Sequence, residues 1–262
     1  MLFRSEELKA IKDDENEIKE RFYMDLEFGT AGLRGIIGAG TNRMNIYVVR
    51  RATQGLANYI AKVDKKSQGV AIAYDSRHMS PEFAQEAALC LAANGIKAYI
   101  FETLRPTPEL SFAVRHLGCV AGINVTASHN PPEYNGFKVW AGQSTIHGEE
   151  IQKIKAIFEE GAFAEGTGTA SRIDIIPTYK QDILSRFKLA RPVKVVLDGG
   201  NGAGGEICAD ILTKLGATVI PMFCEPDGDF PNHHPDPVVE ANMQALMARV
   251  KEEKADLGIG LD

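Results

Sequence analysis

A polar segment at residues 125–132, Val-Thr-Ala-Ser-His-Asn-Pro-Pro, contains residue types suited to phosphoryl transfer. Ser128 precedes a stiff Asn-Pro-Pro turn, which can hold a serine hydroxyl in place as a nucleophile. Lys138, further along, supplies positive charge for phosphate oxygens. The flanking stretches 120–125 and 136–140 have the apolar pattern of buried strands. We therefore expect Ser128 at the carboxyl end of a strand, where open α/β sheets place their chemistry.

Two other interpretations of this segment compete with phosphoryl transfer. A serine-hydrolase site is disfavoured, because Ser128 lacks a Gly-x-Ser-x-Gly elbow and the adjacent His129 is expected on the other side of the backbone. The second alternative involves no chemistry: Thr126, Ser128 and Asn130 would only hydrogen-bond their own turn, as such residues commonly do. The residue types alone leave this second alternative open.

Length and composition indicate a folded protein of one large or two ordinary α/β domains. The chain has 262 residues, of which 44% are hydrophobic and 8% aromatic, which is enough for a sizeable core. Its formal net charge of −6 provides no basic field for counterion release, so we expect no nucleic-acid partner. The sequence shows no signal-peptide core and no stretch approaching the roughly 18 apolar residues of a membrane span. We therefore expect no membrane partner.

The cysteines are far apart in the sequence, and three of them lie in apolar runs. This spacing matches neither a zinc knuckle nor a disulfide framework, so it predicts a reducing, cytoplasmic location. The four residues are Cys90, Cys119, Cys208 and Cys224.

The elements that must position Ser128 alternate between helix and strand, which predicts an α/β fold. The first part of the chain predicts helices at 5–24 (with a break near Asp13), 45–62 (capped by Asn45), 80–94 (capped by Ser80), 105–116, 148–161 and 179–187, strands at 69–75 and 96–101, and an exposed loop at 162–171.

The strand and helix pattern then repeats, which indicates a duplicated α/β unit. We place the domain boundary between residues 188 and 192. The second unit predicts a strand at 193–198, a helix ending before Gly216, a strand ending at Phe223, a helix at 238–254 and a last strand ending at Asp262.

A glycine-rich stretch at residues 28–40 surrounds Arg34. Its glycines let backbone N–H groups approach an anion, and Arg34 can pair with the same anion. Alternatively, the glycines only form a tight hairpin. Arg77 and His78 follow a strand end, and we interpret them as loop residues rather than ligands.

A rival site follows the strand at 193–198. Gly200, Gly202 and Gly205 satisfy the Gly-x-Gly-x-x-Gly spacing of dinucleotide-binding turns, with Glu225 roughly 20 residues on. An NAD-binding oxidoreductase domain is therefore an alternative, although Glu225 falls in a turn-rich segment. In that segment, the spacing of the potential metal ligands matches no known site, and we expect a solvated loop. Those residues are Asp227, Asp229, His233 and His234.

Four segments in the same order resemble the α-D-phosphohexomutases, the phosphoglucomutase/phosphomannomutase family. They are Thr-Ala-Ser-His-Asn-Pro at 126–131, Asn-Gly-Phe-Lys-Val at 135–139, Phe-Gly-Thr-Ala-Gly-Leu-Arg-Gly at 28–35 and Ala-Asp-Leu-Gly-Ile-Gly-Leu-Asp at 255–262. The resemblance implies two consecutive three-layer α/β domains with mixed, mostly parallel sheets. Domain I would span 1–188 and carry the phosphoserine loop, and domain II would span 189–262 and stop at the start of the metal-binding loop.

The resemblance also implies a reaction: interconversion of hexose 1-phosphate and hexose 6-phosphate through a phosphoserine and a hexose 1,6-bisphosphate. Mg²⁺ would be the cofactor, and glucose 1,6-bisphosphate the activator and intermediate. The implied roles are catalysis by Ser128, His129 and Lys138, phosphate binding by Arg34, Thr126 and Asn130, and metal binding by Ser128 and Asp262.

The same resemblance predicts that the chain is an N-terminal fragment that is inactive alone. Asp262 would be only the first of three metal-binding aspartates, and the domains that bind the sugar would be absent. A non-catalytic sugar-phosphate-binding module is a further alternative to the mutase.

Overall fold

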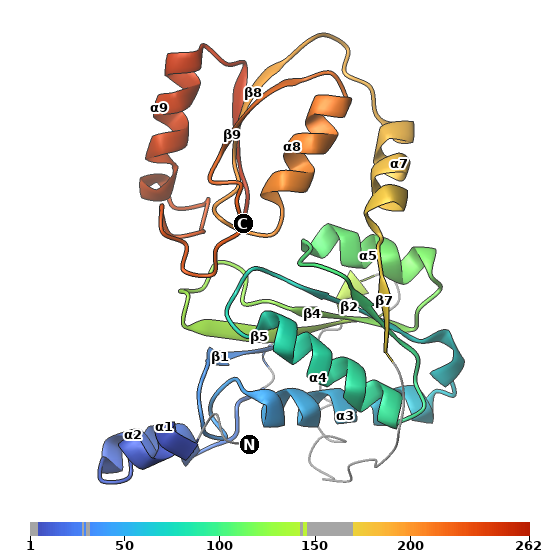
Figure 1. Ribbon diagram of the computed structural model, residues 1–262, viewed down its shortest axis with the longest axis vertical. Coiled ribbons are helices and arrows are strands. Elements are labelled where there is room, and N and C mark those ends of the chain that lie inside the picture. Colours follow the sequence, from blue (N-terminus) through green and yellow to red (C-terminus); the bar gives the residue numbers. More distant parts are fainter. Residues whose placement is uncertain (1–4, 28, 30–31, 142–143, 146–169) are drawn as a thin grey trace.

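The structure, a computed structural model, describes residues 5–27, 29, 32–141, 144–145 and 170–262. It contains two α/β units, each built on its own sheet, with the C-terminal unit above the N-terminal unit in Figure 1. The helix predicted at 148–161 lies outside the described residues. None of the helices within the described ranges is long and apolar enough to cross a membrane.

The N-terminal unit contains a mixed sheet in the order β1-β5-β4-β2-β3-β7, with β6 paired to β5. The central strands β4, β2, β3 and β7 are parallel, and β1, β5 and β6 run antiparallel to their neighbours. The strands are β1 (Leu33–Ile36), β2 (Val70–Tyr74), β3 (Ala98–Phe101), β4 (Ala121–Val125), β5 (Tyr134–Ala141), β6 (Ser144–Thr145) and β7 (Ala170–Ile173).

Helices cover both faces of this sheet, so the unit has three layers. Ile72 of β2 belongs to the larger core, which is shared with α3 and α4. The neighbouring residues Ala71 and Ala73 belong to the smaller core against α5, because successive side chains of a strand point to opposite faces. The helices of this part are α1 (Ser5–Ala10), α2 (Glu15–Phe22), α3 (Ile46–Lys62), the short η2 (Lys66–Gln68), α4 (Ser80–Ala93) and α5 (Thr107–His116). The next helix, α7 (Ile176–Arg186), contacts both α5 and the C-terminal unit.

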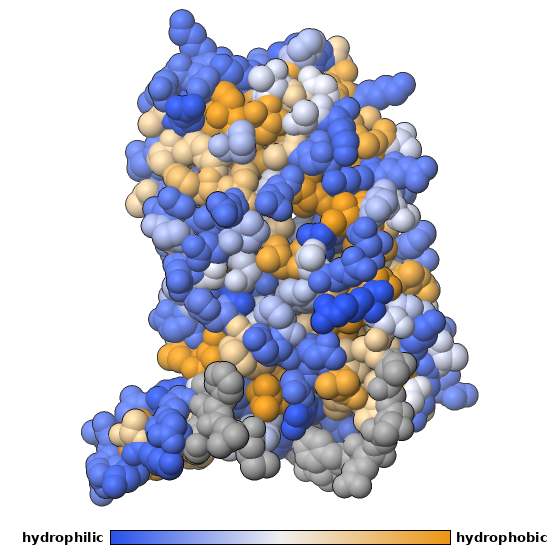
Figure 2. Space-filling model, in the orientation of Figure 1, coloured by the Kyte–Doolittle hydropathy of each residue, from blue (hydrophilic) through white to orange (hydrophobic). Residues whose placement is uncertain are grey.

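The C-terminal unit is a parallel three-stranded sheet in the order β10-β8-β9. Its edge strands are only partly buried, whereas every residue of β2 is buried. On the face seen in Figure 2, apolar side chains reach the surface of this unit. The elements are β8 (Lys194–Asp198), α8 (Gly205–Lys214), β9 (Thr218–Met222), η3 (Glu240–Met243), α9 (Gln244–Glu253) and β10 (Leu257–Gly260).

Most predicted elements are present, and several boundaries differ. The break near Asp13 is confirmed, since Asp14 caps α2 separately from α1. Asn45 caps α3 as predicted. Ser80 does not cap α4: it is the first helical residue, and its hydroxyl donates to Asp75 instead.

Two further boundaries are corrected at segments predicted as a loop and as a helix. Residues 162–169 of the predicted loop at 162–171 lie outside the described residues, and Ala170 and Ser171 pair with β3 and therefore belong to β7. The helix predicted at 238–254 begins as the 3₁₀ turn η3 and becomes α-helical only at Gln244.

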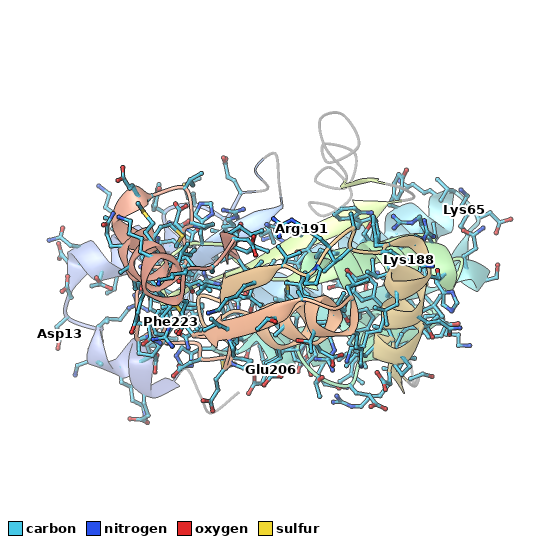
Figure 3. All side chains as sticks on the ribbon, turned by 90° about the horizontal axis from the view of Figure 1, so that it is seen from above. Asp13, Lys65, Lys188, Arg191, Glu206 and Phe223 are labelled. Atoms are coloured by element: carbon cyan, nitrogen blue, oxygen red, sulfur yellow. The ribbon has the colours of Figure 1, made fainter. Side chains whose placement is uncertain are left out.

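In the view from above, charged side chains such as Asp13 and Glu206 lie at the periphery (Figure 3).

Candidate active site

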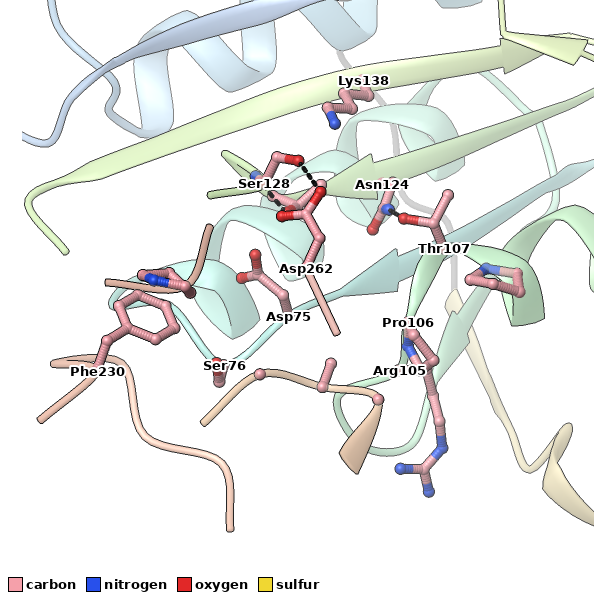
Figure 4. Close-up of a pocket in the computed structure, with 16 residues that line it drawn as sticks. Asp75, Ser76, Arg105, Pro106, Thr107, Asn124, Ser128, Lys138, Phe230 and Asp262 are labelled. Atoms are coloured by element: carbon pink, nitrogen blue, oxygen red, sulfur yellow. Dashed lines mark hydrogen bonds between the residues drawn. The ribbon is translucent and has the colours of Figure 1, made fainter. Parts of the chain in front are cut away.

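A pocket of about 260 Å³ lies between the two units (Figure 4). Of the predicted site residues, Thr126, Ser128, Lys138 and Asp262 line it, whereas Arg34, His129 and Asn130 lie outside its lining. Segments that follow β2, β3 and β4 form one side, together with β5, and segments that follow β8, β9 and β10 form the other. Carboxyl ends of parallel strands from both sheets therefore face one cavity, as open α/β sheets favour. The lining residues are Asp75, Ser76, Arg105, Pro106, Thr107, Pro108, Asn124, Thr126, Ser128, Lys138, Gly202, Ala203, Gly204, Phe230, Pro235 and Asp262.

Ser128 lies just after β4 in a left-handed backbone conformation, with φ at +56°. Such a conformation costs a residue other than glycine about 1–3 kcal/mol and persists only when its surroundings hold it. Thr126 is one such contact, because its hydroxyl accepts a hydrogen bond from the Ser128 N–H at 2.9 Å. The Ser128 hydroxyl donates to Asp262 Oδ2 at 2.9 Å, which places a nucleophilic oxygen beside a carboxylate in the pocket.

His129 reaches the same carboxylate, with its Nδ1 atom 3.6 Å from Asp262 Oδ1. The prediction that His129 lies on the other side of the backbone from Ser128 is therefore wrong. Side chains alternate only along an extended strand, and the left-handed conformation of Ser128 interrupts that alternation.

Lys138 extends into the pocket from β5, opposite Asn124 of β4 (Figure 4). Burial is the main cause that lowers the pKa of its ammonium group, and the nearby charge of Arg34 lowers it further. Asp262 and Asp75 act in the opposite direction. Lys138 is thus a lysine that loses its proton more readily than an exposed one, which suits an acid or base.

Arg34 lies on β1, opposite Gly136 of β5, and its Nη1 atom donates to Asn130 Oδ1 at 3.1 Å. The glycines near it also shape the backbone. Gly32 has φ at +102°, and a Cβ atom there would lie 2.3 Å from the Phe137 carbonyl oxygen. Gly32 therefore permits the close approach of β1 and β5 that brings Arg34 to the loop of Ser128.

Arg77 lies in the loop after β2, as predicted, and its side chain organises the loop of Ser128. Its side chain is fully buried, and its guanidinium group donates to four backbone carbonyls. No sequence spacing signals this arrangement, because the partners are backbone groups more than 50 residues further along the chain. The four carbonyls belong to Ser128, Asn130, Pro131 and Tyr134.

Asp75, at the end of β2, is a second organising residue that the sequence analysis missed. Its carboxylate accepts hydrogen bonds from the Ser80 hydroxyl at 2.8 Å and from the Arg77 N–H at 3.0 Å. Burial raises the pKa of Asp75, while hydrogen bonds from Thr126 and Arg77 oppose that rise. In the sequence, Asp75 is marked only as the end of a buried strand, and a buried strand that ends in aspartate is a common pattern.

The glycine turn, residues 199–205, packs closely against the segment after β9. A Cβ atom on Gly205 would lie 2.7 Å from Cys224 Cα, and one on Gly199 would lie 2.8 Å from the same atom. Asp198 accepts the Gly200 N–H at 2.9 Å. Close packing thus accounts for glycine at positions 199 and 205.

The segment at 225–237 is exposed at Asp227, Asp229 and His234, as the prediction of a solvated loop requires, but it is not solvated throughout. Phe230 is buried and lines the pocket together with Pro235. His233 places Nε2 at 3.0 Å from Asp198 Oδ2, and Asp229 contacts His78 at 2.6 Å. Within the ranges that the structure describes, no group of three or more His, Cys, Asp or Glu residues could hold a metal ion.

Comparison with known proteins decides the family. The description "Phosphoglucomutase/phosphomannomutase, alpha/beta/alpha domain I" matches residues 25–165, and the corresponding domain II matches residues 177–262. The chain belongs to the phosphoglucomutase/phosphomannomutase family. This membership confirms the predicted fold class and gives the NAD-binding alternative no support. The domain boundary between 188 and 192 stays a prediction.

Individual relatives agree with this assignment. A phosphomannomutase/phosphoglucomutase from Pseudomonas aeruginosa is 37% identical over 90% of this chain and 50% of its own length. A phosphoglucomutase from Neisseria gonorrhoeae is 36% identical over the same shares. A solved structure of a phosphoglucomutase/phosphomannomutase family protein from Burkholderia thailandensis matches with a TM-score of 0.81 and 32% identity, over 89% of this chain and 51% of that one. The chain spans about half the length of the curated relatives it matches.

Proposed function

We propose that this family member, at its full natural length, interconverts hexose 1-phosphates and hexose 6-phosphates through a phosphoserine at Ser128. The observation that carries the proposal is the position of the Ser128 hydroxyl, held in the interunit pocket beside Lys138 and Asp262. Relatives named for both phosphoglucomutase and phosphomannomutase support glucose and mannose phosphates as substrates. A cytoplasmic location stays a prediction of the cysteine pattern.

In the proposed reaction, phosphorylated Ser128 passes its phosphoryl group to a hydroxyl of the bound hexose phosphate. The bond from phosphorus to the serine oxygen breaks as the bond to the sugar oxygen forms. Lys138 takes the proton of the sugar hydroxyl, since its lowered pKa makes the neutral amine more accessible than in an exposed lysine. The departing serine oxygen takes up a proton and becomes the hydroxyl again. The resulting 1,6-bisphosphate reorients and returns its other phosphoryl group to Ser128. Glucose 1,6-bisphosphate would prime the serine in the same way.

Charge is the main problem that the site must solve. A phosphoserine carries about −1.5 to −2 charges, and Asp262 lies within hydrogen-bond distance of the Ser128 oxygen. Two anions so close repel each other unless a cation lies between them. Their oxygens are the ligands that Mg²⁺ prefers, so we assign Ser128 and Asp262 to an Mg²⁺ site. When bound, Mg²⁺ would neutralise charge on the transferred group.

We assign phosphate binding to the remaining polar residues around Ser128. Arg34 brings a guanidinium group to Asn130 at the edge of the loop, where it can also meet a phosphate oxygen. Thr126 lines the pocket beneath Ser128 and fixes its backbone N–H. His129 shares Asp262 with Ser128 and is assigned to the catalytic group. That residues 1–262 alone lack activity stays a prediction, which a coupled assay for glucose 6-phosphate tests.

A labelling experiment tests the proposal and separates a mutase from a non-catalytic binding module. The dephosphorylated protein is incubated with ³²P-labelled glucose 1,6-bisphosphate, and the labelled peptide is mapped. We expect covalent label on Ser128 and none in the matched Ser128→Ala variant. A binding module would retain no covalent label, and label on Thr126 or His129 would assign the reaction to another residue.

A further inference from the structure

The loop after β9 contacts the N-terminal unit through residues 227–230, which we call the latch. Gly228 lies so close to residues 76–78 that a Cβ atom there would be 2.8 Å from the Ser76 carbonyl oxygen and 3.2 Å from the His78 nitrogen. Asp229 adds a contact of 2.6 Å to His78 Nε2. The segment that the latch touches is therefore the segment that carries Arg77.

The latch has a fixed internal shape. Asp227 accepts two hydrogen bonds from within it, from the Asp229 N–H at 2.9 Å and from the Phe230 N–H at 3.2 Å. Its own N–H donates to the Asn201 carbonyl, which also accepts the Ser76 hydroxyl at 3.1 Å. One carbonyl of the glycine turn thus joins the latch and the N-terminal unit.

The Arg77 guanidinium group lies over the face of the Phe230 ring, with its central carbon 4.9 Å from the ring centre. The guanidinium N–H groups are directed to the carbonyls of the Ser128 loop. Phe230 is buried, with 9% of its surface exposed, so this cation–π contact is largely desolvated. Such contacts are stronger than exposed ones.

We propose that Phe230 and Arg77 are positioning residues for phosphoryl transfer: the latch holds the guanidinium group in place, and that group fixes the orientation of Ser128. The inference rests on the proposed function, because it concerns the reactivity of the same serine. It assigns the C-terminal unit a direct part in setting the geometry of the nucleophile. It also gives residues 227–230 a role that their sequence did not reveal.

The physical reason is that Ser128 occupies a strained backbone conformation that must be imposed from outside. Arg77 can hold Ser128 in this conformation only while its own guanidinium group is held in place. The Nε atom of Arg77 has only a long contact, 3.5 Å, to Asp75 Oδ2. The Phe230 ring, held by the latch, adds a contact to the guanidinium group that does not depend on its hydrogen bonds to the loop of Ser128. A branched aliphatic side chain of similar size would fill the space without attracting the charge.

The test measures how fast Ser128 is phosphorylated in the protein at its full natural length. Dephosphorylated protein is mixed with excess labelled glucose 1,6-bisphosphate, and label is followed by rapid quench. We expect Phe230→Leu to lower the rate constant about tenfold while the final amount of label per folded protein stays complete. Phe230→Tyr, which keeps the ring face, should restore most of the rate.

Gly228→Ala is the second variant, and it serves also if Phe230→Leu does not fold. Its new methyl group meets backbone atoms of residues 76–78, so it should separate the latch from Arg77 and lower the rate constant severalfold. Phe112→Leu is the matched control, because it removes aromatic contacts to His116 and Tyr179 but none to a guanidinium group. We expect its rate constant to be unchanged.

The outcomes separate this inference from the proposed function. Unchanged rate constants in Phe230→Leu and Gly228→Ala, with normal labelling of the unmodified protein, would overturn the positioning role and leave the phosphoserine intact. A reduced amount of label at an unchanged rate constant would show loss of folded protein, and it would also overturn the positioning role. Failure of the unmodified protein to label at Ser128 would overturn both.

Discussion

Two polar turns face the same pocket from opposite units, and they contribute different things. The serine loop, residues 126–131, projects side chains from a backbone that Arg77 holds through three of its carbonyls and through that of Tyr134. The glycine turn, residues 199–205, lines the pocket mainly with residues that have almost no side chain. The first turn is built around functional groups, and the second is built for close packing and backbone exposure.

The difference shows why a matching spacing is a weaker guide than the chemistry of the side chains. Gly200, Gly202 and Gly205 satisfy the dinucleotide spacing. Packing nevertheless explains Gly205, because a Cβ atom added there would lie 2.7 Å from Cys224 Cα. No comparable packing explains a hydroxyl, a carboxylate and an ammonium group around one cavity, those of Ser128, Asp262 and Lys138. The following substitutions test this contrast, in decreasing order of expected effect.

Arg77→Ala should be the most damaging change, because it removes the clamp of the serine loop. It removes four hydrogen bonds to backbone carbonyls and leaves Asp75 without its ionic partner, and we expect a loss of about 3–5 kcal/mol in the free energy of unfolding. Urea unfolding measures it. The control is Arg50→Ala, which breaks a partly exposed ion pair with Glu86 and should cost less than about 1 kcal/mol. Equal losses in both variants would refute the clamp.

Lys138→Ala should lower the turnover of the full-length protein by at least about 100-fold, as expected for a lost general acid or base. The fold should survive, since the side chain lies at the pocket. Steady-state assays across pH measure the effect, with the exposed Lys62→Ala as control. Near-normal turnover with an unshifted pH profile would show that Lys138 is only a strand residue.

Lys138 also predicts a pH dependence of stability. Its folded-state pKa is lowered, so above that pKa and below the ordinary lysine value near 10.4 the unfolded chain holds more protons. The stability of the unmodified protein, relative to Lys138→Met, should therefore rise with pH across this window. At neutral pH we expect Lys138→Met to be the more stable protein. A difference that does not change with pH would contradict the pKa shift.

Gly205→Ala should destabilise the glycine turn by about 1–3 kcal/mol, because the new Cβ atom would meet Cys224 backbone atoms that cannot move easily. Thermal or urea unfolding measures the loss. A destabilisation below the error of the measurement would mean that the turn adjusts, and that close packing is not the reason for glycine there.

Gly202→Ala should have the smallest effect, below about 1 kcal/mol, since its nearest contact would be 3.3 Å to the Gly199 carbonyl oxygen. A dinucleotide-binding turn would instead need both glycines for its ligand. Calorimetric titration of the unmodified protein with NAD should show no binding. Binding that Gly202→Ala abolished would revive the alternative that the packing argues against.

The sequence could predict the parts of the fold that depend on local pattern. Asn45, the break near Asp13 and the strands around Ser128 were found from capping and apolar runs. The sequence also predicted that Ser128, Lys138 and Asp262 share one site, although this prediction depended on a family resemblance as well as on residue types.

The missed features depend on contacts between distant segments. Arg77 and Phe230 act through backbone carbonyls and a ring face contributed by other parts of the chain, for which no local pattern exists. His129 was placed on the wrong side because the left-handed conformation of Ser128 arises from tertiary contacts rather than from its own preference. Ser171 joined a strand because β3 offered it an edge to pair with.

The most direct test of the central claim is whether the phosphoryl group on Ser128 is passed on to a sugar. The protein at its full natural length is phosphorylated, freed of ligand and mixed with one equivalent of glucose 6-phosphate, and its intact mass is followed. We predict that the mass falls by about 80 Da, the mass of one phosphoryl group, as an equal amount of glucose 1,6-bisphosphate appears. A phosphoprotein of unchanged mass, or one that releases only inorganic phosphate, would contradict the account.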